Sequence, residues 1–172
     1  MPHLDSAYNL ARWLTRNDAD AQDVVQEAML RAFKYFDGFD GRYAHAWLLK
    51  IVRNACFTWV REKQSMSTAV PLDENLDAID RDGSVLALSA QGLGRSPEVI
   101  VGEIQDARRL DALINQLPAA YREVIILREM EDLSYREIAE ISGVPIGTVM
   151  SRLARARQML QTGRRKSSGT RG

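Results

Sequence analysis

The last 31 residues of the chain, from Ser142 onward, carry arginines and no carboxylate. Residues 134–157 read SYREIAEISGVPIGTVMSRLARAR, and from Ser142 to the last residue there are seven Arg or Lys and no Asp or Glu. Arginine can bond guanine bidentately in the major groove of DNA, and it also binds phosphates. This stretch therefore offers five candidate contacts to duplex DNA, namely Thr148, Ser151, Arg152, Arg155 and Arg157.

The residues around these candidates predict a helix-turn-helix. Ser134 and Glu137 have the spacing of a capping box, which begins a short helix. Gly143 supplies a left-handed position that ends this helix, and Pro145 opens the next one. Apolar residues then recur at helical spacing and face the core, namely Val149, Leu153, Ala156 and Leu160.

In such a motif the second helix enters the major groove of DNA. We predict that Arg152 reads a base and that Arg155 and Arg157 hold phosphates. The alternative is the solvated outer face of an ordinary bundle helix. A capped short helix, a glycine turn and uninterrupted positive charge together favour DNA binding.

A row of polar side chains lies on another expected helix, from about residue 20 to residue 36. Asp20 is placed to cap it, Asp23 and Glu27 follow on the same face, and Phe33 points largely inward with Val24 and Ala28. Catalysis or cation binding is poorly supported, because the acids occupy one helix and no nucleophile lies nearby. The row is either a binding face for another protein or a solvated face.

A third helix is expected from Ala44 to Lys63. Its predicted buried stripe consists of Trp47, Ile51, Ala55 and Trp59. The outer face combines basic, amide and aromatic side chains, which suit single-stranded nucleic acid. These residues are Lys50, Arg53, Asn54, Phe57 and Arg61, and Phe57 could belong either to this face or to the core.

Helical periodicity and composition together predict an all-α protein of two small helical domains joined by a flexible linker. The first domain spans 1–63, and an acidic linker rich in Ser and Gly spans 64–97. The second domain spans 98–163 and contains the helix-turn-helix. A basic tail, 164–172, is expected to be disordered.

The composition argues against a membrane protein, a disulfide-bonded protein and a metalloprotein. No apolar run approaches the roughly 20 residues of a membrane span, and the first residues do not resemble a signal peptide, so we expect a cytoplasmic protein without membrane insertion. Cys56 is the one cysteine, and His3 and His45 are the two histidines. We therefore expect no disulfide, no metal, no cofactor and no enzymatic activity.

Four motifs resemble one known family. They are DAQDVVQEA (20–28), AWLLKIVRNA (46–55), LPAAYREV (117–124) and GTVMSRLARAR (147–157). In this order they resemble the extracytoplasmic-function sigma factors of the bacterial sigma-70 family, over residues 4 to 63 and 105 to 162. The resemblance implies two domains, corresponding to sigma region 2 and sigma region 4, and the job of directing core RNA polymerase to promoters, usually in a stress response.

The resemblance also implies partners for each polar face. The row formed by Asp20, Asp23, Gln26 and Glu27 would dock on the clamp helices of the beta-prime subunit, and the second domain on the beta flap. The third helix would read the −10 element, with Asn54 at a base-reading position. The helix-turn-helix would read the −35 element, and an anti-sigma factor would hold the protein inactive.

Two departures from the family pattern bear on this expectation. Position 150 is Met where many relatives carry a basic residue, and loop residues 42–44 match no motif. Two rival functions also stay open. One is a sigma-like decoy that sequesters an anti-sigma factor, and the other is a repressor whose first domain senses a ligand.

Overall fold

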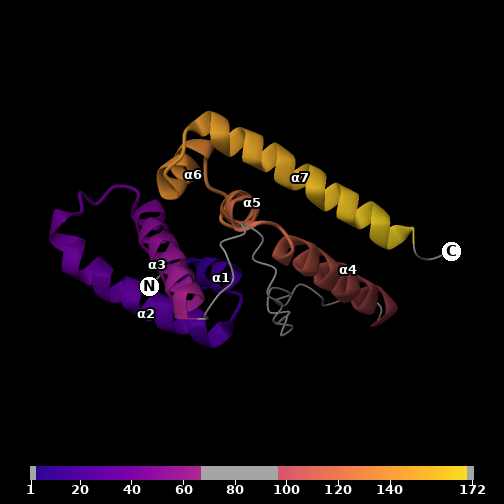
Figure 1. Cartoon of the computed structure of the whole chain (residues 1–172), viewed down its shortest axis with the longest axis horizontal. Helices are drawn as coiled ribbons and strands as arrows, with labels where there is room; N and C mark the ends of the chain where they lie inside the picture. The colour runs from indigo at the N-terminus through magenta and orange to yellow at the C-terminus, as the bar shows by residue number, and fades with distance from the viewer. Residues whose placement is uncertain (1–2, 67–96, 170–172) are drawn as a thin grey trace.

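The computed structural model describes residues 3–66 and 97–169, with side chains of the second range given from residue 102. Within these ranges the elements are all helical and no strand occurs. The helices form two groups in chain order, one from α1 to α3 and one from α4 to α7 (Figure 1). The prediction of an all-α fold with two small helical domains is confirmed.

The first domain packs three helices around one core. They are α1 (Leu4–Thr15), α2 (Asp18–Tyr35) and α3 (Ala44–Met66), with a short 3-10 turn η1 (Phe36–Gly38) after α2. All three helices pack pairwise against one another. Small and medium apolar residues fill the centre, so the helices approach closely, and examples are Ala7, Leu10, Ala21, Val24 and Ala28.

The start of α2 differs from the prediction. Its N-cap is Asn17, whose side chain accepts a hydrogen bond from the backbone N–H of Asp20 at 3.0 Å. The predicted capping role of Asp20 was therefore wrong, because an amide three residues earlier already meets the free N–H groups of the first turn. Phe33 was also expected inside, and it is 63% exposed.

The buried face of α3 is rotated from the predicted stripe. Leu49, Val52 and Cys56 are completely buried, whereas Trp47, Ile51 and Trp59 are only partly buried and pack at the edge of the core. Of the predicted stripe, Ala55 is in the core. The large aromatic rings suit the rim, where part of each ring can stay in contact with water.

The second domain contains four α-helices and one π-helical turn. They are α4 (Pro97–Asn115), α5 (Ala119–Ile125), the π turn η2 (Ile126–Met130), α6 (Tyr135–Ser142) and α7 (Ile146–Ser168). Val124, Ile126 and Leu127 are buried at the centre, together with Ile138 and Leu153. The helices α5, α6 and α7 thus share one core.

The C-terminal tail also differs from the prediction. Helix α7 continues to Ser168, past the expected domain end at residue 163 and through the first residues of the predicted disordered tail. Arg165 and Lys166 lie in its last turn, where positive charge is favourable to the negative end of the helix dipole. The predicted linker falls almost wholly on residues 67–96, which lie outside the described residues.

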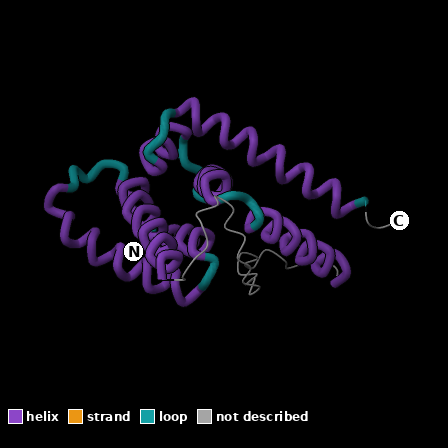
Figure 2. Tube along the Cα trace, in the orientation of Figure 1, coloured by secondary structure: helices purple, strands orange, loops and turns teal. Residues whose placement is uncertain are grey.

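The two domains contact each other in this structure. Helix α1 packs against α5 and η2, and α3 packs against α6. Figure 2 shows the shortest helices of the second domain next to the first domain, with the long helix α7 on the far side of them. The helix-turn-helix therefore meets the first domain through α6.

Candidate polymerase and nucleic-acid interfaces

The turn between α6 and α7 has the predicted geometry. Ser134 Oγ accepts from the N–H of Glu137 at 3.2 Å, and the Glu137 carboxylate accepts from the N–H of Ser134 at 2.8 Å, which completes the capping box. Gly143 has a φ of 68°, in the left-handed region, and Pro145 precedes the first residue of α7. The helix-turn-helix is thus fixed by its own local hydrogen bonds.

The buried face of α7 places the candidate DNA residues outward. Val149 and Ala156 are completely buried, and Leu153 is 1% exposed. Ser151 and Arg155 are consequently exposed, while Thr148 and Arg152 are half-buried. This face carries the Arg152 guanidinium within the first two turns of α7, the part of the second helix that contacts base edges in a helix-turn-helix.

Arg157 has a partner within its own domain. Its Nη2 lies 2.8 Å from Glu129 Oε1 at the end of η2. The hydrogen bond that Arg157 donates to Glu129 raises the pKa of Arg157 above its ordinary value, so the side chain stays charged. This ion pair is exposed, and a phosphate could replace the carboxylate at little cost.

The five candidate residues of α3 are not equally accessible. Lys50, Asn54 and Arg61 are exposed, whereas Arg53 and Phe57 are partly buried. The Arg53 guanidinium lies over the Phe57 ring at 4.3 Å from its centroid, and Arg53 Nη1 donates to Asn54 Oδ1 at 3.3 Å. The structure therefore brings three of the five together into one cation–aromatic–amide group.

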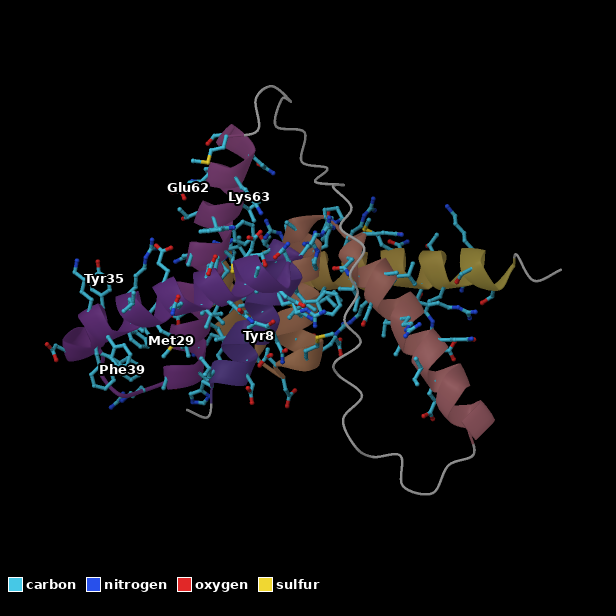
Figure 3. All side chains as sticks on the ribbon, turned by 90° about the horizontal axis from the view of Figure 1, so that it is seen from below. Tyr8, Met29, Tyr35, Phe39, Glu62 and Lys63 are labelled. Carbon is cyan, nitrogen blue, oxygen red and sulfur yellow. The ribbon has the colours of Figure 1, made fainter. Side chains whose placement is uncertain are left out.

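In the polar row on α2, the first residue, Asp20, is held by an ion pair. Asp20 forms an ion pair with Lys63 near the end of α3, where Figure 3 labels the lysine. Asp23, Gln26 and Glu27 are exposed, and Glu27 pairs with Arg31 one turn later. The row is thus a solvent-facing surface that the first domain holds in place.

An apolar surface beyond this row was missed from the sequence. Leu30, Phe33 and Tyr35 are more than 60% exposed at the end of α2, and Phe36 and Tyr43 follow in η1 and the next loop. Figure 3 shows Tyr35 and Phe39 at the end of α2 that lies far from the second domain. Exposed aromatic residues in such number mark an interaction surface.

Charged residues that link the two domains were also missed. Glu123 and Arg122 are 1% and 2% exposed in α5, although charged residues are rarely buried without partners. Glu123 pairs with Arg53 of the first domain, and Arg122 donates to the carbonyl oxygen of Trp13. The motif LPAAYREV contained both residues, but nothing in their spacing pointed to partners in α1 and α3.

The described residues contain neither a candidate metal site nor a candidate membrane span. No group of three or more His, Cys, Asp or Glu there could hold a metal ion. None of the helices in these ranges is both long enough and apolar enough to cross a membrane.

Comparison with known proteins agrees with this geometry. A family model described as Sigma-70 region 2 matches residues 1–66, and one described as Sigma-70, region 4 matches residues 107–160. The ECF RNA polymerase sigma factor SigW of Bacillus subtilis (strain 168) is 33% identical over 160 residues, which is 91% of this chain and 82% of that protein. The ECF RNA polymerase sigma-E factor of Escherichia coli (strain K12) is 32% identical over 143 residues, covering 82% and 72%.

Solved structures show the same two-domain fold. The sigma factor RpoE of Bartonella quintana, in complex with the anti-sigma factor NepR, superposes with a TM-score of 0.69 and 26% identity, over 95% of this chain and 92% of that one. A structure of CnrH in complex with the cytosolic domain of CnrY superposes with a TM-score of 0.61 at 23% identity, which bears on the fold alone. The chain belongs to the extracytoplasmic-function sigma factors of the sigma-70 family, which are transcription initiation factors.

Proposed function

We propose that this sigma factor binds core RNA polymerase and directs it to promoters through two separate DNA contacts. The observation that supports this most is the presence of two polar faces on two domains, one on α3 and one on α7. Two contacts joined through polymerase select a promoter far more strongly than either contact alone. Because core polymerase and the chromosome occupy the bacterial cytoplasm, the protein would act there.

The α7 face would read the −35 element as a duplex. Arg152 would contact a base edge in the major groove, with Thr148 and Ser151 beside it. Arg155 and Arg157 would hold phosphates, which set register and supply salt-dependent affinity. Met150 is 53% exposed on the same helix, so an apolar side chain would stand where many relatives have a basic one.

The α3 face would hold the −10 element once its strands have separated. A single strand exposes base faces that can stack on an aromatic ring, and Phe57 with Arg53 above it offers such a surface. Asn54 is exposed next to this pair and has both donors and acceptors for a base edge. Lys50 and Arg61 would follow the phosphates on either side.

The polar row and the apolar end of α2 would together bind polymerase. Asp23, Gln26 and Glu27 are solvent-exposed, and Leu30 and Phe33 continue the same helix with exposed apolar surface. A buried apolar centre bordered by charge is the usual composition of a protein interface. The beta-prime clamp helices are the proposed partner of this surface, and the beta flap that of the second domain.

Charge reversal on α2 tests the proposed docking. Asp23→Lys with Glu27→Lys should lower the affinity for core polymerase at least about tenfold at low salt, since both charges would face the partner with the wrong sign. A matched variant, Asp5→Lys with Glu62→Lys, changes two exposed acids of α1 and α3 and should bind normally. Equal co-purification of both variants with core polymerase would contradict the assignment.

An anti-sigma partner is proposed from the similar fold. The related sigma factor of Bartonella quintana was solved with an anti-sigma factor bound. We expect this chain to have such a partner, which would restrict its activity to a stress response. The decoy alternative predicts binding to an anti-sigma factor without transcription.

Run-off transcription separates these functions. The purified chain and bacterial core polymerase are incubated with genomic DNA fragments, and the 5′ ends of the transcripts are sequenced. We expect discrete start sites that core polymerase alone does not use. A decoy or a ligand-sensing repressor would add no start site at any position.

A further inference from the structure

Helix α7 is longer than a helix-turn-helix needs. It has 23 residues, so it is about 34 Å long. The major groove of DNA is about 12 Å wide, and only the first turns of such a helix can lie inside it. The family model for sigma region 4 ends at residue 160, so the last turns of α7, residues 161–168, lie beyond the part that this model matches.

One line of exposed polar side chains follows the whole of α7. Val149, Leu153 and Ala156 form the buried face of the helix. On the side away from this face, polar residues recur at spacings of four, three, four and three, which places them in one line along the helix. They are Ser151, Arg155, Gln158, Thr162 and Arg165, and all five are exposed. The line begins among the proposed −35 contacts and ends at a cation in the last turns.

Positive charge dominates the end of this helix. Arg164, Arg165 and Lys166 are consecutive and exposed. The nearby hydroxyl groups bond within the helix, because Thr162 Oγ1 donates to the carbonyl oxygen of Gln158 at 3.0 Å and Ser167 Oγ donates to that of Arg164 at 2.9 Å. The cations are therefore the groups that the last turns present to a partner.

Helix α4 holds this part of α7 in place. The two helices pack against each other, and a Cβ added at Gly163 would lie 2.5 Å from Leu113 Cδ2, so the helices are close there. Figure 1 shows the end of α7 at the edge of the molecule, pointing away from the first domain. The cations thus stand on a supported helix, just past its contact with α4.

The composition of the last turns favours a nucleic-acid partner over a protein. Residues 161–168 read QTGRRKSS and contain no apolar side chain. Protein interfaces usually have an apolar centre and are depleted in Lys, whereas DNA phosphates are bound by Arg and Lys without apolar contact. The chemistry of this end therefore matches a phosphodiester backbone.

The length of α7 decides which phosphates are in reach. Arg155 and Arg165 are ten residues apart, which is about 15 Å along the helix axis. This separation exceeds the width of the major groove, about 12 Å, so one helix cannot keep both residues inside the groove. With the first turns of α7 in the −35 groove, Arg165 lies at the sugar–phosphate backbone beside it. This step rests on the proposed −35 role of α7.

We infer that the end of α7 is a second DNA contact, in which Arg165 and Lys166 bind phosphates of the duplex next to the −35 element. These contacts carry no sequence information, because phosphates are the same at every base pair. They add affinity that depends on salt, since each neutralised phosphate releases counterions. The first turns of α7 thus set base preference, and the last turns strengthen binding to any sequence that flanks the element.

The salt dependence of promoter binding tests this inference. Arg165→Gln with Lys166→Gln removes two charges and keeps good helix formers. The matched control, Arg108→Gln with Arg109→Gln, removes two exposed charges from α4 of the same domain. Each variant of the full-length chain is assembled with core polymerase, and its affinity for a mapped promoter duplex is measured at several salt concentrations.

Each phosphate contact contributes about 0.9 to the slope of log affinity against log salt concentration. The slope should therefore decrease by about 2 in the α7 variant and stay at the wild-type value in the α4 variant. Preference among −35 elements with single base changes should be the same in all three proteins. An unchanged slope in the α7 variant, or an equal decrease in both variants, would overturn the inference.

Ethylation of single phosphates locates the contact, because an ethylated phosphate has lost its charge. Ethylation of phosphates beside the −35 element should weaken binding of the wild type and have no effect on the α7 variant. An acidic surface of polymerase is the other possible partner of these cations. Weaker binding of the α7 variant to core polymerase, with the wild-type ethylation pattern, would show that partner and contradict the inference.

Failure of the proposed function gives a different result. If the wild-type complex bound a promoter with a scrambled −35 element as tightly as the native one, the reading role of α7 would be wrong. If it preferred the native element while slope and ethylation pattern were the same in the α7 variant, only the second DNA contact would be wrong.

Discussion

At the residue scale, Arg152 and Arg155 differ in what they are proposed to contact. Arg152 is half-buried near the start of α7, and Arg155 is exposed about one turn later. A guanidinium bound to a base edge distinguishes sequences, whereas one bound to phosphate attracts every sequence equally. The two arginines should therefore give different mutational signatures.

Replacing Arg152 by Ala should cost about 1 to 3 kcal/mol at one −35 base pair and reduce preference at that position. Replacing Arg155 by Ala should weaken binding about equally for all sequences and lower the salt dependence. Competition between −35 duplexes with single base changes, read in the polymerase complex, measures both. If Arg152→Ala kept the wild-type base preference, another side chain would be the reader.

Cys56 connects the core of the first domain with the domain boundary. The pKa of its thiol is raised from 9.0 to about 12, mainly by burial and further by the nearby Glu123 charge, while the Arg53 charge acts in the opposite direction. Between these two pH values the unfolded chain has released the proton and the folded chain has kept it. The contribution of Cys56 to stability is therefore complete below pH 9 and decreases as the pH rises towards about 12.

The loss of stability through Cys56 can be measured at alkaline pH. At pH 10 the free energy of unfolding of the wild type should have lost about 1 kcal/mol through this thiol, a loss that Cys56→Ala does not undergo. Urea denaturation of both proteins at pH 8 and pH 10 gives the comparison. Equal losses in the two proteins would mean that the thiol is not held protonated by the fold.

At the element scale, the contact between α4 and α7 depends on a glycine. A Cβ added at Gly163 would lie 2.5 Å from Leu113 Cδ2, whereas nothing lies within 4 Å of one added at Gly102 in α4. Both glycines are inside helices, where Ala is the better helix former. Comparing alanine substitutions at Gly102 and Gly163 therefore separates the effect of steric contact with Leu113 from the effect of helix propensity.

Gly102→Ala should stabilise the protein by about 0.5 to 1 kcal/mol. Gly163→Ala should be about 1 to 2 kcal/mol less stable than Gly102→Ala, because Leu113 must turn away or α4 must shift. Chemical denaturation of both variants measures the difference. Equal stabilisation by the two substitutions would show that α4 does not pack on α7 at this place.

Local sequence patterns predicted the positions of the helices well, but they predicted the buried face of each helix less well. The capping box at Ser134 and the left-handed Gly143 act within a few residues, so sequence spacing is enough to find them. The buried face of α3 was wrong by a fraction of a turn, because large aromatic residues were assumed to be central. The burial of Phe33 was predicted wrongly for the same reason. In a periodic pattern, an aromatic residue on an exposed surface cannot be distinguished from one in the core.

At the scale of the whole molecule, contacts between the domains were beyond prediction. Arg53 and Glu123 are 70 residues apart, with the linker between them. A single Arg and a single Glu carry no periodicity, so no pattern can pair them. The packing of α3 against α6, and of α1 against α5 and η2, brings the two domains together.

The same two-domain arrangement determines how a promoter would be recognised. In transcription, the two domains would bind two elements of one promoter while polymerase fixes the distance and angle between them. Inserting about five base pairs between the elements rotates one by roughly half a turn of DNA relative to the other. Two linked contacts cannot tolerate this rotation, whereas two independent contacts can.

The most direct measurement is run-off transcription from a mapped promoter whose spacer has been lengthened in this way. A promoter with the same number of spacer bases substituted, and no change in length, serves as the control. We predict that the substituted promoter keeps its start site and its activity, and that transcription from the lengthened promoter falls to the level of core polymerase alone. Unchanged initiation from the lengthened promoter would contradict the claim that the two domains read one promoter together.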